Sequence, residues 1–289
     1  MADRIGPVAV LGATGAVGSA LLVDLAARGV RPLAVVRPGS GGPSRDVADV
    51  VEGDLTRPES LLPALTGART LLLLTPLHPA QDSLQRAIVE VAKEAGVERV
   101  VKVSALGADP AARCSIHRQH GLVEEALAES GLRHTLVRPN GFAQNLRQWL
   151  PGITARGAIA LPVGDAEVSW VDVRDVAAVA AVALTDPALD GAVLEVTGPR
   201  ALDYPTVAGY FSRELGREVR FVDVSPEAAF DAMTGAGMPP WAAEARLGLY
   251  ATYRAGEAAL VTTTVEDVVG RPARALTSVV GELLGRTPV

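Results

Sequence analysis

Short apolar runs alternate with longer segments of helical periodicity through the first half of the chain. Runs rich in valine and leucine are typical of strands in a parallel sheet that is covered on both faces. The segments between them repeat apolar residues every three or four positions, as amphipathic helices do. The predicted strands are residues 8–11, 33–36, 47–51, 70–74, 99–103 and 135–138, and the predicted helices are residues 15–28, 58–65, 80–95 and 115–130. This alternation predicts an α/β fold with a doubly wound parallel sheet of the Rossmann type.

The aromatic side chains divide the chain into two unequal regions. The sequence has 3 Trp, 4 Tyr and 4 Phe, and the first of them is Phe142. Wide apolar side chains commonly line pockets for organic ligands. We therefore predict a first domain over residues 1–141 and a smaller C-terminal α+β substrate-binding subdomain over residues 142–289. Elements from about residues 165–200 are expected to return to the first domain.

Composition narrows the class of protein. The chain has 289 residues with 27 basic and 33 acidic side chains, and this acidic balance counts against a nucleic-acid surface. Its one cysteine, Cys114, cannot form an intramolecular disulfide, which fits a reducing cytosol. Glycines and an aspartate interrupt the apolar stretch over residues 5–25, so we expect neither a signal peptide nor a membrane span. The composition favours a cytoplasmic protein that acts on small molecules, and it leaves the oligomeric state open.

Three glycines follow the first predicted strand and open the first helix. Gly12 permits a tight turn, Gly15 lets backbone N–H groups approach a pyrophosphate, and Gly18 lets the helix pack closely on the sheet. The free N–H groups at the start of that helix would hold the pyrophosphate. In this strand–turn–helix context, the triplet predicts dinucleotide binding.

The residue after the second strand distinguishes the two nicotinamide cofactors. An Asp or Glu there would accept from the ribose 2′-hydroxyl and repel a 2′-phosphate. This chain has Arg37 instead, whose guanidinium can bind a phosphate through two hydrogen bonds. Arg37 could also be an ordinary surface residue, but its position favours NADP(H).

Further candidates leave later strands at the carboxyl edge of the sheet, where ligands bind in open α/β folds. Asp54 and Leu55 lie where a carboxylate could meet the adenine amino group. Asp54 could equally cap the following helix, a role for which Thr56 competes. Residues 75–77 and Ser104 leave the fourth and fifth strands at the same edge.

The series of motifs resembles the NmrA-like branch of the atypical short-chain dehydrogenase/reductases, which includes NAD(P)H:quinone oxidoreductases. The resemblance covers nearly the whole chain. It rests on residues 12–18, 35–37, 53–55, 103–107, 124–127, 130–132, 136–139 with Phe142 and Asn145, 171–176 and 262–274.

This resemblance implies a set of NADP(H) contacts. The expected cofactor-binding residues are Thr14, Ala16, Val17, Arg37, Asp54, Thr75, Pro76 and Leu77. It also implies that the backbone around Ser104, and residues 138–141 with Pro139 and Asn140, lie near the nicotinamide.

The catalytic pair of typical short-chain dehydrogenases is missing. That pair is Tyr-x-x-x-Lys, in which the Tyr donates a proton and the Lys lowers the pKa of the Tyr. The corresponding register falls on Ile116 to His120, and no Tyr precedes residue 141. His120 resembles a histidine of some quinone-reductase relatives. It is a candidate proton donor, and so is His78 after the fourth strand, although either could be an ordinary polar surface residue.

The remaining histidines are expected to be structural. Cys114, His117 and His120 are three apart, a spacing that matches no usual zinc ligand set and would splay the ligands around a helix. We therefore expect no metal site. His134 lies in the sixth predicted strand and is also assigned a structural role.

The substrate pocket is predicted from the second half of the chain. Phe142, Asn145, Trp149 and Trp241 are the proposed substrate-binding residues, and an aromatic lining would suit a quinone or another flat conjugated acceptor. The same rings could instead fill the core of the subdomain.

These features predict an NADPH-dependent oxidoreductase that transfers hydride to a conjugated carbonyl or a quinone-like substrate. A quinone that accepts hydride becomes a delocalised phenolate, so it needs a strong proton donor less than a simple ketone does. Two alternatives stay open. One is a redox sensor that binds NADP(H) without turnover, and the other is a tailoring epimerase or dehydratase.

Overall fold

The computed structural model describes residues 6–286 and contains a parallel sheet in the order β3-β2-β1-β4-β5-β6-β9. Its strands are β1 (Val8–Val10), β2 (Leu33–Val36), β3 (Asp49–Glu52), β4 (Thr70–Leu73), β5 (Arg99–Val103), β6 (Arg133–Pro139) and β9 (Val193–Val196). The strand order reverses between β1 and β4, where α/β folds bind ligands beyond the carboxyl ends of the strands. The prediction of a doubly wound parallel sheet is confirmed.

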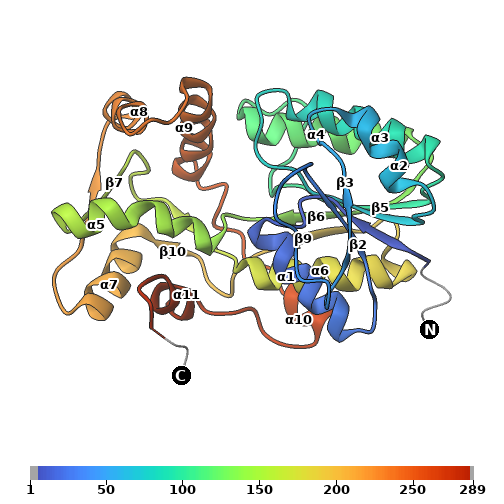
Figure 1. Cartoon of the computed structure of the whole chain (residues 1–289). Helices are drawn as coiled ribbons and strands as arrows, with labels where there is room; N and C mark the ends of the chain where they lie inside the picture. Colours follow the sequence, from blue (N-terminus) through green and yellow to red (C-terminus); the bar gives the residue numbers. More distant parts are fainter. Residues whose placement is uncertain (1–5, 287–289) are drawn as a thin grey trace.

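Helices cover both faces of this sheet (Figure 1). One face packs on α1 (Ala16–Ala27), α6 (Val173–Thr185) and α10 (Thr264–Val269), and the other on α2 (Leu62–Leu65), α3 (Gln81–Glu94) and α4 (Ser115–Glu129). Alternate residues of β1 belong to the hydrophobic cores on opposite faces of the sheet. Val8 and Val10 belong to the core with α1 and α6, whereas Ala9 belongs to the core on the other face. The predicted helix over residues 58–65 is a 3-10 turn, Pro58–Leu61, that runs into α2.

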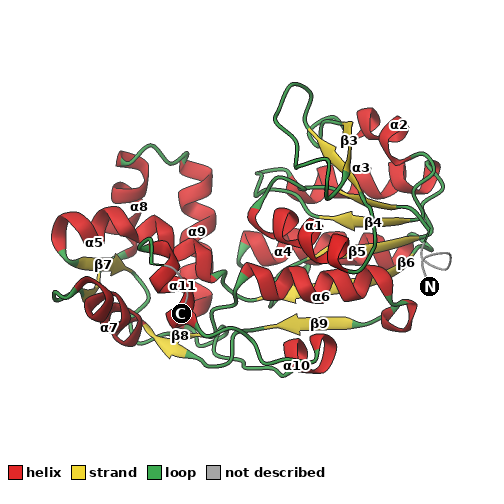
Figure 2. Cartoon of the chain, turned by 60° about the horizontal axis from the view of Figure 1, so that its bottom comes forward, coloured by secondary structure: helices red, strands yellow, loops and turns green. Residues whose placement is uncertain are grey.

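A second lobe lies beside the sheet (Figure 2). It contains α5 (Leu150–Arg156), α7 (Tyr204–Leu215), α8 (Pro226–Gly235), α9 (Pro240–Arg254) and α11 (Leu276–Leu283), with the short strands β7 (Ala158–Leu161), β8 (Glu167–Val168), β10 (Leu202–Asp203) and β11 (Arg220–Asp223). The strands form two small sheets, β10-β8 and β11-β7. The 3-10 turn Ala143–Trp149 leads from β6 of the sheet into α5 of this lobe, whereas the 3-10 turn Pro187–Leu189 connects α6 to β9 in the sheet lobe.

An aromatic cluster fills the core of the second lobe. The rings of Trp149 and Trp170 meet edge to face with centroids 5.6 Å apart, and Tyr204 lies 5.6 Å from Trp149. Phe211 and Tyr253 belong to the same buried cluster. The two lobes thus have separate cores, although α6 and β9 follow residue 142 and return to the sheet. The exact domain boundary stays a prediction.

The buried Asp175 on α6 ties the C-terminal segment to the sheet lobe. The Asp175 carboxylate is fully buried; it accepts from Arg271 at 2.7 Å, from the Arg274 backbone N–H at 2.6 Å and from the Arg274 guanidinium. Asp172 caps the start of α6 by accepting from the Arg174 backbone N–H. These contacts give both carboxylates a structural role.

Within residues 6–286, none of the helices combines the length and the apolar character that crossing a membrane would require.

Candidate functional site

The glycine turn brings β1 and the start of α1 into very close contact. Gly12 has a φ of 69°, in the left-handed region that favours glycine. A Cβ on Gly18 would lie 2.1 Å from the Gly12 carbonyl oxygen and 2.8 Å from the Ala13 Cα. Gly15 is the N-cap of α1, and no side chain within residues 6–286 caps that helix start. Its first N–H groups are thus left to bind another acceptor, as the sequence predicts.

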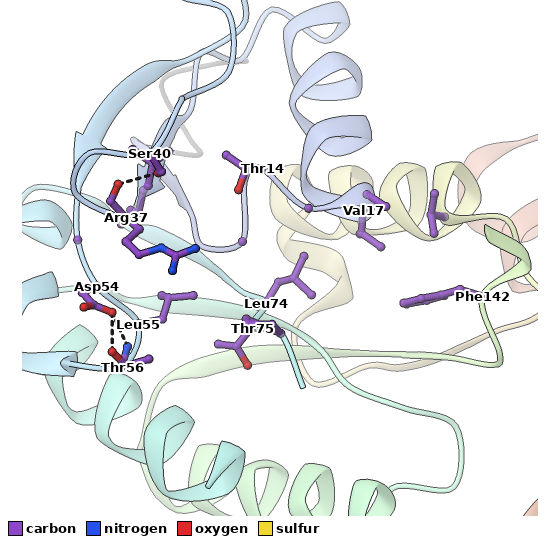
Figure 3. Close-up of a pocket in the computed structure, with 18 of the residues that line it drawn as sticks. Thr14, Val17, Arg37, Ser40, Asp54, Leu55, Thr56, Leu74, Thr75 and Phe142 are labelled. Carbon is purple, nitrogen blue, oxygen red and sulfur yellow. Dashed lines mark hydrogen bonds between the residues drawn. The ribbon is translucent and has the colours of Figure 1, made fainter. Parts of the chain in front are cut away.

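An outer cleft of about 530 Å³ opens over this turn (Figure 3). The Arg37 side chain extends into it between Thr14 and Asp54, and within residues 6–286 it forms neither an ion pair nor a hydrogen bond through its guanidinium. The cleft is lined by most of the predicted cofactor residues, namely Gly12, Thr14, Gly15, Ala16, Val17, Arg37, Asp54, Leu55, Thr75 and Pro76, and also by Ser40, Gly53 and Gln144, which the sequence did not single out.

The predicted helix-capping role of Asp54 is wrong, and its side chain remains placed for the other predicted role. Its carboxylate accepts from the Thr56 backbone N–H at 2.9 Å and from the Thr56 hydroxyl at 2.7 Å, and these bonds lower its pKa. This contact caps a turn, whereas the N-cap of the following 3-10 turn is Arg57. The Asp54 side chain also borders the cleft, where it could meet an adenine ring.

An inner cavity of about 260 Å³ continues from the outer cleft toward the second lobe. The two share the residues Leu74, Thr75, Phe142 and Asn145, which come from the end of β4 and from the connection after β6. The inner cavity is lined further by Leu77, Gln81, Ser104, His117, His120, Pro139, Asn140, Tyr253 and Glu257. Burial raises the pKa of the Tyr253 hydroxyl, so this group stays protonated.

A buried polar network backs the inner cavity. The Lys102 ammonium donates to the Gln85 side-chain oxygen at 2.9 Å and lies 3.0 Å from Nδ1 of His120. Gln85 in turn donates to the Thr75 hydroxyl at 2.6 Å, and the Gln81 amide lies 3.2 Å from Nε2 of His120. Lys102 was not among the residues predicted from the sequence. The sequence signal for it is a lysine between two valines inside a buried strand that has its other charge, Arg99, at the first position.

Glu124 joins β5, α4 and β6 behind the same wall. It accepts from the Ser104 hydroxyl at 2.5 Å and from Nε of Arg138 at 3.1 Å. The Ser104 hydroxyl is therefore engaged in a structural contact, and Ser104 borders the inner cavity rather than the outer cleft. The Asn140 side chain is also engaged in structural contacts. Its amide donates to the Ser169 hydroxyl at 2.7 Å and to the Ala258 carbonyl at 2.8 Å.

Several predicted site residues lie elsewhere. His78 accepts from the Ala80 backbone N–H at 3.1 Å and borders a separate surface cavity with Trp241, away from His120. Trp241 is 37% exposed on α9, and Trp149 lies in the aromatic core, so neither lines the joined cavities. Gly18 supports the turn without lining the cleft, and His134 bonds to the Leu132 carbonyl at 3.0 Å.

We expect the buried lysine to make stability depend on pH. Burial lowers the pKa of Lys102 to about 7, although Glu124 acts in the opposite direction. An unfolded lysine keeps its proton up to a pKa of about 10.4. The unfolded state therefore binds more protons between these values, and stability should rise with pH by at most about 1.4 kcal/mol per unit. Urea unfolding at pH 7 and pH 8.5 measures this rise, which Lys102→Met should reduce; an equal rise in that variant would contradict the assignment.

Comparison with known proteins places the chain in a family. The profile of the NmrA-like family matches residues 6–279. The chain belongs to the NmrA-like family. The resemblance predicted from the sequence is thus confirmed.

Relatives in this family include characterised reductases. The chain is 38% identical over 269 residues to an NAD(P)H azoreductase of Xenophilus azovorans, covering 92% of this chain and 94% of that one. It is 37% identical over 270 residues, with the same coverage, to a (4-alkanoyl-5-oxo-2,5-dihydrofuran-3-yl)methyl phosphate reductase of Streptomyces griseus. The structure of an NADPH-dependent quinone oxidoreductase from Escherichia coli in complex with NADPH superposes with a TM-score of 0.87 at 25% identity, covering 96% of this chain and 100% of that one.

Proposed function

We propose that this protein is an NADPH-dependent reductase of flat conjugated acceptors, quinones and azo compounds in particular. The observation that supports this most is that the two cavities share the wall residues Leu74, Thr75, Phe142 and Asn145. A cofactor in the outer cleft and a planar acceptor in the inner cavity would meet at this shared wall. Positioning of this kind is a large part of what a hydride-transfer enzyme has to supply.

The reaction class and the cofactor agree with the relatives. They include an NAD(P)H azoreductase and an NADPH-dependent quinone oxidoreductase beside the phosphate reductase. The sequence predictions of an NAD(P)H-dependent oxidoreductase and of NADP(H) as its cofactor are confirmed.

The residues present in the outer cleft fit this cofactor. A side chain at Gly18 would fill the space in which the turn closes on α1. The Arg37 guanidinium, which has no partner among the described residues, offers a positive charge for a 2′-phosphate. The backbone of residues 14–17 would hold the pyrophosphate at the start of α1. When bound, NADPH supplies the hydride.

The inner cavity fits an uncharged planar acceptor. Phe142 offers an apolar surface, and the protonated Tyr253 hydroxyl and the His120 ring offer polar groups beside it. The related azo and quinone substrates are flat conjugated molecules of this kind. His120 is the group that we assign to proton delivery, because its ring lines the inner cavity; it occupies the lysine position of the missing Tyr-x-x-x-Lys register, and Ile116 occupies the tyrosine position.

Arg37→Ala should weaken the use of NADPH selectively. Loss of a charge-assisted hydrogen bond costs about 1.5–3 kcal/mol, so we expect KM for NADPH to rise by about 10- to 100-fold. KM for NADH should change less than twofold, because NADH lacks the 2′-phosphate. Steady-state kinetics with both cofactors, at saturating acceptor, measure the difference.

Arg28→Ala is the matched control, because Arg28 is also exposed and its side chain lies outside the cleft. Its kinetics should equal those of the unaltered protein. An equal loss with NADPH and NADH in Arg37→Ala would remove the argument for a 2′-phosphate contact.

The proposed activity is tested by NADPH consumption with a panel of quinones and azo dyes, in the unaltered protein and in His120→Ala. We expect turnover with at least one acceptor and a lower kcat in the variant. Tight NADPH binding without oxidation by any acceptor would favour the redox sensor instead. Product formation without net NADPH consumption would favour an epimerase or a dehydratase.

A further inference from the structure

Lys102 is a fully buried charge with a complete set of hydrogen-bond acceptors. It lies on β5 and its exposed fraction is 0%. Its Nζ contacts the Gln85 side-chain oxygen at 2.9 Å, Nδ1 of His120 at 3.0 Å and the Val103 carbonyl oxygen at 3.4 Å. An ammonium has three hydrogens and accepts none. The three neighbours therefore match the protonated form of Lys102.

This geometry fixes the tautomer of the neutral His120 ring. Because the ammonium can only donate, Nδ1 of His120 carries the lone pair and Nε2 carries the hydrogen. The Gln81 side chain lies 3.2 Å from Nε2. The oxygen and nitrogen of an amide can exchange places by a half-turn, so the Gln81 oxygen can accept from Nε2. Since His120 and Gln81 both line the inner cavity, an acceptor there can replace Gln81 as the partner of Nε2–H.

The charges around the pair keep the ring neutral and the lysine close to releasing its proton. Burial, the Lys102 ammonium and His117 on the same helix all lower the pKa of His120 well below its usual value. Burial lowers the pKa of Lys102 to about 7, while Glu124 on α4 acts to raise it. Glu124 is itself paired with Arg138 of β6, and Glu257 faces His117. α3 contributes the uncharged Gln81 and Gln85.

We propose that Lys102 is the proton reservoir of this reductase and that His120 passes its proton to the reduced acceptor. The proposal rests on the function proposed above. An acceptor that has gained hydride carries negative charge on oxygen or nitrogen. That atom takes the proton from Nε2 of His120, while Nδ1 takes one from Nζ of Lys102. One bond to hydrogen breaks at Nε2 and one at Nζ; one forms on the acceptor and one at Nδ1.

The step leaves a neutral lysine and a neutral histidine in the opposite tautomer. No electrons move beyond those of the hydride transfer. A proton from water then adds to Nε2 of His120 and Nδ1 returns its proton to Nζ of Lys102, which restores the starting tautomer and the ammonium before the next turnover. Lys102 acts only through His120, and the pair performs the task that the missing tyrosine performs in typical short-chain dehydrogenases.

The tautomer can be measured without turnover. The chain has 4 His, so the ¹⁵N imidazole resonances of His120 are assigned by their loss in His120→Gln. At pH 6 we expect a neutral ring with hydrogen on Nε2, and in Lys102→Met a mixture of both tautomers. A ring protonated only on Nδ1 at pH 6, or an unchanged ring in Lys102→Met, would overturn the proposal.

Kinetics then test the relay. General acid catalysis contributes about 100- to 10,000-fold, so Lys102→Met should lower kcat by about 100-fold with little change in KM. The fall of kcat above pH 7, where Lys102 loses its proton, should vanish in that variant. Lys102→Arg keeps the charge and cannot release a proton, so it should not restore kcat.

A double variant separates the relay from a structural role. If Lys102 acts through His120, adding Lys102→Met to His120→Gln should lower kcat by less than about threefold more. If the losses of kcat in the two single variants multiply in the double variant, or if Lys102→Arg restores kcat, the relay is wrong. If Lys102→Met does not fold, the proposal is tested by the tautomer of His120 and by its pH dependence in the unaltered protein. Absence of turnover in the unaltered protein would instead refute the proposed function, and the tautomer measurement would still report on the pair.

Discussion

Gly18→Ala should weaken NADPH binding by about 100-fold, because a small displacement of a binding element is enough to cost that much. The added Cβ would lie 2.1 Å from the Gly12 carbonyl oxygen and 2.8 Å from the Ala13 Cα, so backbone must move to admit it. The movement separates the start of α1 from the turn that presents its N–H groups. Titration calorimetry with NADPH measures the loss, with circular dichroism to verify that the variant is folded.

Gly209→Ala is the matched control for this substitution. Gly209 lies within α7, and nothing is within 4 Å of the position that a Cβ would take. Alanine is preferred over glycine in a helix by about 1 kcal/mol, so this variant should be as stable or more stable and should bind NADPH normally. Unchanged NADPH affinity in folded Gly18→Ala would show that the turn is not the cofactor site.

Asp175→Ala should lower the free energy of unfolding by about 3 kcal/mol, the lower end of the cost of breaking a buried ion pair. The substitution leaves Arg271 and Arg274 without their shared carboxylate and removes the acceptor of the Arg274 backbone N–H. We expect the lower end because both guanidiniums can still reach water. Urea unfolding followed by circular dichroism measures the change.

Asp49→Ala serves as the comparison. Asp49 pairs with Arg31 at 2.8 Å on the surface, where both side chains are more than half exposed. Such pairs contribute about 0–1 kcal/mol, so this variant should keep nearly full stability. Equal losses in the two variants would mean that Asp175 holds the C-terminal segment no more firmly than a surface contact does.

The sheet was predictable because its determinants are local. Each of the six predicted strands and each helix of the first half appears in the structure within a few residues of its predicted bounds, since valine-rich runs and helical periodicity act over short spans. The glycine turn and Arg37 were predictable for the same reason: their positions follow directly from adjacent strands. The seventh strand, β9, was anticipated only as a return of chain from about residues 165–200.

The inner cavity could not be predicted from the sequence, because its residues meet through contacts between segments that lie far apart along the chain. Tyr253 reaches it from α9, and Lys102 meets His120 and Gln85 only because α3 and α4 pack on β5. The aromatic rings illustrate the same limit. Composition predicted a cluster in the second half, but whether Trp149 lined a pocket or filled a core depended on packing between distant segments. His78 likewise follows the expected strand and yet turns to another surface.

The placement of the aromatic rings has a practical consequence for spectroscopy. All 3 Trp follow residue 141, Trp149 and Trp170 are packed together, and the sheet's strands through β6 contain no aromatic residue. Tryptophan fluorescence therefore reports on the second lobe and does not detect unfolding of the sheet. Far-ultraviolet circular dichroism detects that unfolding. Recording both signals along one denaturation curve would reveal whether the halves of the molecule come apart as a single cooperative unit or one after the other.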